Sequence, residues 1–90
     1  MADDADEVAR AAAALAVIAL VEGCIADGVR AGEFRAGLDP ARAARLLFAA
    51  FEGGVMLAGV THGPHGFTAI KEDLMGIVEG WRAAGAGGRP

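Results

Sequence analysis

Few side chains in this sequence are of the types that carry chemistry, and they form no complete catalytic or metal-binding set. His62 and His65 lie in one short segment, but a metal site needs more ligands than two imidazoles, and the nearest acidic residues belong to the next predicted helix. The segment is therefore expected to be a turn. Since no nucleophile is paired with a base and no glycine loop is typical of phosphate binding, the sequence predicts no enzyme activity, no cofactor and no metal.

Cys24 is the only cysteine, so neither an internal disulfide nor a cysteine metal site can form within one chain. No neighbour in the sequence is a cation that would activate its thiol. An inert buried thiol is therefore expected rather than a redox sensor, and a reducing cytoplasm suits the chain.

Two acidic residues could serve a binding site. Glu22 lies near the apolar side of the first predicted helix, where a buried carboxylate could bind a cationic ligand, although a solvated side chain is the alternative. Glu52 could be a pocket or interface acid. It also fits a narrow polar strip with Arg45 and Gly59 that repeats every seven residues.

Three predicted helices must position these residues, at about 6–31, 40–61 and 67–83, because strong helix formers dominate each range. No stretch alternates as a strand would, so the fold class is all-α. Residues 1–83 are expected to be one helical domain, followed by a disordered, glycine-rich tail at 84–90.

The segment between the first two predicted helices contains residues that typically end one helix and begin the next. Gly28 and Gly32 can adopt the left-handed backbone that ends a helix. Asp39 can accept hydrogen bonds from the free amides of the next helix, and Pro40 suits its first position, where no N–H is needed.

The second predicted helix has two apolar faces, found by placing successive residues about 100° apart. One is rich in small residues and would let another helix approach closely, and it comprises Leu46, Ala49, Ala50, Gly53, Leu57 and Val60. The opposite face is bulkier and would fill a core, and it comprises Ala44, Phe48, Phe51, Val55 and Ala58. Two apolar faces require two partners, as in a helix that bridges subunits.

The first and third predicted helices differ from the second in how their apolar residues are arranged. The third predicted helix has a single apolar stripe, made of Phe67, Ile70, Leu74, Ile77, Val78 and Trp81. The first is apolar all round between residues 11 and 21, which two helices cannot cover well.

The segment from Ile25 to Leu57 resembles the C-terminal regulatory domain of TetR-family transcriptional repressors, through Gly32-Glu33-Phe34-Arg35, Leu38-Asp39-Pro40, Ala43-Ala44-Arg45-Leu46-Leu47 and Phe51-Glu52-Gly53. The likeness continues more loosely from Phe67 to Arg82. It implies a three-helix fragment of such a domain, dimerising as a four-helix bundle. In that family, several preceding helices form the walls of an inducer pocket, and a DNA-binding helix-turn-helix comes before those helices. Neither the preceding helices nor the helix-turn-helix is found in these ninety residues.

The resemblance implies a ligand-sensing and dimerisation domain. The residues expected to line a pocket for a small hydrophobic ligand are Leu15, Ile18, Glu22, Phe48, Phe51 and Val55. The residues expected at a homodimer interface are Leu46, Ala49, Ala50, Gly53, Leu57, Val60, Ile70, Leu74, Ile77, Val78 and Trp81. The alternative is a stand-alone helical homodimer that acts as a structural or interaction module without sensing.

Composition excludes several classes of partner. Hydrophobic residues make up 54% of the chain and charged residues 22%, which indicates a folded protein. A net charge of −4 with dispersed basic residues argues against nucleic-acid binding by this chain alone. The apolar run at 11–21 is shorter than the about 20 residues of a membrane span, and the leader is acidic, so we expect a cytoplasmic chain without a membrane segment.

Overall fold

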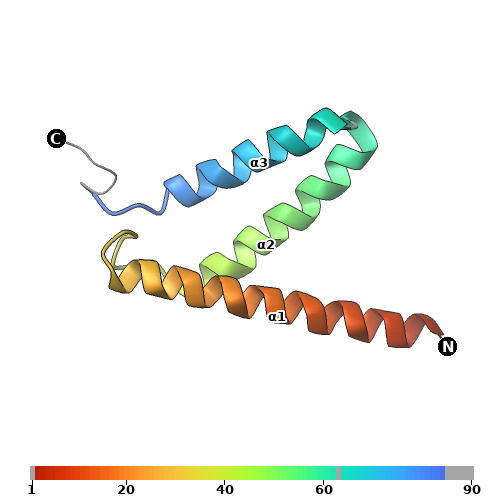
Figure 1. The fold of residues 1–90 in the computed structure, drawn as a ribbon, viewed down its shortest axis with the longest axis horizontal. Helices are drawn as coiled ribbons and strands as arrows, with labels where there is room; N and C mark the ends of the chain where they lie inside the picture. The colour runs from red at the N-terminus through yellow and green to blue at the C-terminus, as the bar shows by residue number, and fades with distance from the viewer. Residues whose placement is uncertain (1, 63, 85–90) are drawn as a thin grey trace.

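The computed structural model describes the backbone of residues 2–62 and 64–84 and the side chains of residues 4–60 and 66–84. Its elements are α1 (Ala2–Arg30), α2 (Pro40–Leu57), a π-helical turn η1 (Ala58–His62) and α3 (Pro64–Glu79). The described residues form no strand, only one isolated antiparallel bridge between Phe34 and Arg82. The predicted all-α class with three helices is confirmed (Figure 1).

The helix bounds differ most from expectation at α3. It begins at Pro64 rather than near residue 67, because proline suits the first turn of a helix. It ends at Glu79 rather than near residue 83. The N–H groups of Gly80 and Trp81 turn back to the carbonyls of Ile77 and Val78, which releases the chain from the helix before the tryptophan. Residues 85–90 of the expected tail lie outside the described residues.

The connection from α1 to α2 has the predicted helix stop. Gly32 adopts φ +81°, in the left-handed region. Its N–H donates to the carbonyl of Val29 at 3.1 Å, and that of Glu33 donates to the carbonyl of Gly28 at 2.9 Å. These two bonds form a Schellman motif. Gly28 itself stays helical.

The start of α2 also agrees with the sequence. The Asp39 carboxylate accepts from the backbone N–H of Ala41 at 3.1 Å and of Arg42 at 3.4 Å, while Pro40 occupies the first helical position. The direction in which α2 leaves the loop is therefore set by a local cap.

A short backbone pairing ties the end of α3 to this loop. The N–H of Arg35 donates to the carbonyl of Trp81, and the N–H of Ala83 donates to the carbonyl of Glu33, both at 2.9 Å. The rings of Phe34 and Trp81 meet edge to face, with centroids 6.0 Å apart. Consequently the C-terminal end of α3 lies beside the C-terminal end of α1, as Figure 1 shows.

The core is small and lies at this corner. Its buried members are Ile25, Leu38, Ala43 and Ala44, with Ile18, Val21, Val29, Phe34 and Trp81 packed around them. α2 packs against both α1 and α3. The N-terminal half of α1 extends away from the other helices (Figure 1).

The three helices form one layer rather than two. The molecule measures 56 × 29 × 13 Å, and its shortest dimension is close to the ~10–12 Å diameter of a single helix. The radius of gyration is 15.7 Å, against ~12 Å for a compact domain of this length. Because stable domains bury a core between at least two layers, this layer leaves apolar surface uncovered on both sides.

Candidate functional site

An apolar hollow lies between α1 and the α2–α3 pair, and we call it the middle hollow. Its volume is about 380 Å³. Bulky α2 side chains face it because α1 and α3 both approach that side of α2. The residues that line it are Val17, Val21, Leu47, Phe48, Phe51, Leu74, Met75 and Val78.

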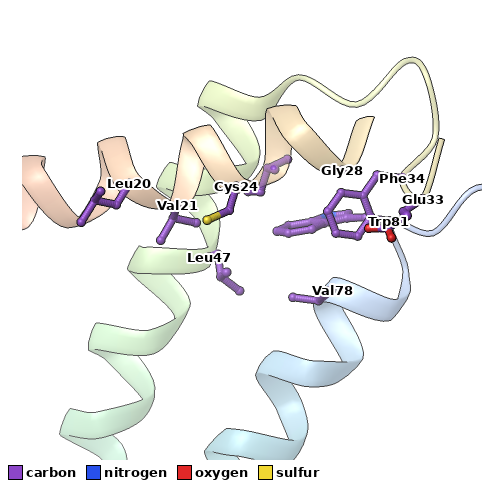
Figure 2. A pocket seen from close by; sticks show the side chains of 10 residues that line it. Leu20, Val21, Cys24, Gly28, Glu33, Phe34, Leu47, Val78 and Trp81 are labelled. Carbon is purple, nitrogen blue, oxygen red and sulfur yellow. The ribbon is translucent and has the colours of Figure 1, made fainter. Parts of the chain in front are cut away.

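The inner hollow adjoins it toward the loop and has a volume of about 350 Å³. Its lining is Leu20, Val21, Cys24, Ile25, Gly28, Glu33, Phe34, Leu47, Val78 and Trp81. Figure 2 shows Val21, Cys24, Leu47 and Val78 around an open space, with Phe34, Trp81 and Glu33 at one end. Glu33 is the only charged side chain in this lining.

The outer hollow lies at the other end and has a volume of about 300 Å³. Its lining is Phe51, Val55, Phe67, Ile70, Lys71, Leu74 and Met75. The middle hollow shares Val21, Leu47 and Val78 with the inner one, and Phe51, Leu74 and Met75 with the outer one. Neighbouring hollows therefore share side chains in their walls, and we call the three together the trough.

A separate groove runs along the α2–α3 pair. Its lining is Ala49, Ala50, Gly53, Gly54, Leu57, Ile70, Asp73, Leu74 and Ile77, and its volume is about 350 Å³. Around α2, at about 100° per residue, these small residues point roughly opposite to Phe48 and Val55 of the trough side. We call this surface the pairing groove.

Gly53 and Gly54 play different parts there. A Cβ at Gly54 would lie 3.0 Å from Cγ2 of Ile70, so this glycine allows the close approach of α2 and α3. A Cβ at Gly53 would meet nothing within 4 Å. Gly54 thus serves packing within the chain, whereas Gly53 leaves open space in the groove.

The structure brings only some of the predicted ligand residues to the trough. Phe48 and Phe51 line the middle hollow, and Phe51 and Val55 line the outer one. Ile18 instead packs on the core. Leu15 is 68% exposed, Glu22 is exposed, and neither lines any of the hollows. The side of α1 that faces α2 carries Val17 and Val21, and Glu22 lies about 100° around the helix from Val21.

The predicted interface residues divide between the two sides of the layer. Those that line the pairing groove are Ala49, Ala50, Gly53, Leu57, Ile70, Leu74 and Ile77. Leu46 and Val60 are exposed elsewhere on α2 and η1. Val78 lines the trough, and Trp81 packs against the core of its own chain, because the chain leaves α3 before the tryptophan.

The expectation of a buried thiol at Cys24 is wrong. The side chain is exposed and lines the inner hollow, because no described helix covers this side of α1. Glu52 is exposed, as its polar strip predicts. No cluster of three potential metal ligands occurs among residues whose placement is described. The side chains of His62 and His65 lie outside that part, although their backbones belong to η1 and α3.

Sequence reasoning missed Glu33 and the intrachain role of Trp81. The signal for Glu33 was the helix stop itself, because in a Schellman motif the residue after the left-handed glycine folds back over the last turn. Trp81 had no such local signal, since its position depends on backbone pairing with residues far earlier in the chain.

Two stretches, Asp4–Arg30 and Pro40–Val60, are long and apolar enough to cross a membrane, and each contains an 18-residue window with a mean hydropathy of 2.0 and 1.5, respectively. The expectation of no membrane segment rests on the apolar run at residues 11–21 alone, and both stretches found here are longer than that run. Length and composition alone are weak evidence, because the core helices of soluble proteins pass the same test.

Comparison with known families gives one match. A family model described as "Tetracyclin repressor-like, C-terminal domain" matches residues 2–74, which is most of the chain. No curated protein and no solved structure matches the chain.

Proposed function

Because the chain belongs to the Tetracyclin repressor-like C-terminal domain family, we propose that it is a ligand-sensing and dimerisation domain of a TetR-type regulator. One observation carries this proposal: the same two helices present the pairing groove on one side and the apolar trough on the other. A ligand bound in the trough would contact helices that also hold a second subunit. It could therefore shift the relation between subunits, which is what coupling of two sites requires.

Pairing is supported by the amount of surface left uncovered. The chain exposes 6418 Å², about a third more than the ~4,900 Å² of a compact monomer of 9.0 kDa. If each of two copies buried this excess, the interface would cover about 3,000 Å², within the ~2,000–5,000 Å² of obligate homodimers. Small residues in the groove would let the helices of a partner approach closely.

Ligand binding is supported by the trough's size and lining. Each hollow has a volume of about 300 to 380 Å³, at the lower end of the ~300–1,000 Å³ of small-molecule sites, and neighbouring hollows share lining residues. The middle hollow has only apolar side chains. Such a surface favours a hydrophobic ligand and gives little help to catalysis, in keeping with a regulatory domain that is not an enzyme.

The proposed domain would act in the cytoplasm and would not hold DNA by itself. The net charge of −4 opposes approach to phosphates. The two apolar helices are accounted for by burial in the dimer and beneath a ligand, rather than by a membrane.

Sedimentation velocity of the chain at micromolar concentration, with and without an apolar fluorescent dye, tests both parts. We expect a dimer that binds dye saturably. A monomer would contradict pairing. A dimer that binds neither dye nor any apolar ligand would instead support the alternative, a structural module without sensing.

A further inference from the structure

Glu33 is the one acidic side chain in the lining of the trough. It lies at the inner end, beside Trp81 (Figure 2). The middle hollow has no charged lining, and the outer hollow has Lys71 at the far end. The trough is therefore apolar along its length, with an acid at one end and a base at the other.

The arginines close to Glu33 in the sequence, and Arg82 across the backbone pairing, make other contacts. Arg30 pairs with Asp27. Arg82 pairs with Glu79 at 3.5 Å, and Nη1 of Arg35 donates to the carbonyl of Gly80 at 3.0 Å. Among the described residues, no ion pair involves the Glu33 carboxylate. The Glu33 carboxylate is exposed and unpaired in this part of the structure, so a cation that enters the inner hollow can reach it.

Two aromatic rings line the same hollow. Phe34 and Trp81 are held perpendicular, at 85°, by their edge-to-face contact, and Trp81 is fixed further by the backbone pairing of its carbonyl with Arg35. Aromatic faces attract ammonium groups through their quadrupole, most strongly for tryptophan. A carboxylate beside aromatic rings thus has the chemistry for a cationic head group rather than an anionic one.

We propose that the trough binds a singly charged cationic amphiphile, with its ammonium head at Glu33, Phe34 and Trp81 and its apolar tail along the middle hollow. This inference rests on the proposed ligand site and assigns its ligand class. From Val78 to Phe67 the trough follows twelve residues of α3, whose eleven steps of 1.5 Å span ~17 Å, so a long unbranched tail fits the space. The negative net charge of the chain also favours approach of a cation.

Trp81 reports binding directly, because it is the only tryptophan in the chain and lines the inner hollow. The full chain is titrated with alkyltrimethylammonium ions from octyl to tetradecyl, below their micellar concentrations, and with alkyl sulfates and neutral alkyl maltosides of equal tail length. We expect saturable binding that tightens about threefold to fourfold per added CH₂ until the trough is filled. The cation should bind more tightly than the sulfate of the same tail length.

The variant Glu33→Gln separates the head-group contact from the tail. It should weaken binding of the cation about threefold to tenfold and leave the neutral maltoside unchanged, since only a charged contact is lost. Glu22→Gln removes the same charge from an exposed position outside the trough, and it should leave the cation's affinity near that of the unmodified chain. Circular dichroism checks that both variants keep their helices.

The remaining outcomes overturn the inference in distinguishable ways. If all three head groups bind equally and Glu33→Gln changes nothing, the cation assignment is wrong while the proposed apolar ligand site stands. If the sulfate binds best and Lys71→Gln removes that preference, the head lies at the outer end and the ligand is an anion. If no amphiphile binds, the proposed ligand site and this inference fail together.

Discussion

Gly28 and Phe34 lie so close together that a Cβ on the glycine would be 2.6 Å from Cδ2 and 2.7 Å from Cε2 of the phenylalanine ring. The helix stop at Gly32 folds the chain back over the last turn of α1, and the ring of Phe34 packs against the backbone of Gly28, which has no side chain. Phe34 then meets Trp81, so this contact connects the end of α1 with the end of α3. The corner that contains the cluster of Ile25, Leu38, Ala43 and Ala44 depends on this contact.

Replacement of Gly28 by alanine should therefore destabilise the chain. The added methyl group forces the Phe34 ring away from its place against Trp81, and overpacking of this kind costs about 1–3 kcal/mol. The free energy of unfolding is measured by urea denaturation, followed by Trp81 fluorescence. Gly23→Ala is the matched control on the same helix, where a Cβ meets nothing within 4 Å. Its better helix propensity should leave stability equal or raise it by up to about 1 kcal/mol. Equal effects at the two sites would contradict this account of the corner.

Replacement of Gly53 by leucine should weaken self-association without weakening the folded chain. Its side chain has open space within the chain but would fill the pairing groove, so the dimer dissociation constant is expected to rise about fivefold or more, as about 1–3 kcal/mol of overpacking implies. Sedimentation equilibrium measures the constant, and circular dichroism measures the melting temperature.

Gly54→Leu provides the contrast, because its Cβ would press on Ile70 at 3.0 Å and should lower the stability of the chain itself. If Gly53→Leu leaves the dissociation constant unchanged, the pairing groove is not the contact surface between subunits.

Ile18→Asp should destabilise the chain far more than Val8→Asp. Ile18 packs against the core, so an aspartate there loses apolar contacts and brings a charge toward a region without a partner, at a cost of at least about 2 kcal/mol. Val8 is 69% exposed on the free half of α1, and such surface changes stay within about 0.5 kcal/mol. Thermal unfolding of both variants makes the comparison. A large loss at Val8 would mean that the free half of α1 is covered by a second copy in solution.

Sequence alone determined the features that depend on short-range backbone chemistry. A glycine helix stop at Gly28 or Gly32, the Asp39 cap and Pro40 at the first helical position were all predictable, because such features depend on groups within a few residues. The structure selects Gly32 for the left-handed position. The all-α class and the family relationship were predictable as well, and so were the two apolar faces of α2, since helical periodicity alone separates Phe48 and Val55 from Ala49 and Gly53.

Tertiary structure decided which helix faces pack together and which side chains line the hollows between the helices. Glu33, Phe34 and Trp81 come together through backbone bonds between residues 33–35 and 81–83, and no local pattern specifies a pairing across that separation. The same geometry left Cys24 exposed and placed Glu22 outside the trough, although both lie on a helix whose existence was predictable. Helical periodicity selects no side of α1, because residues 11–21 are apolar all round. Only the packing of α2 and the return of α3 select the side of α1 that becomes a site.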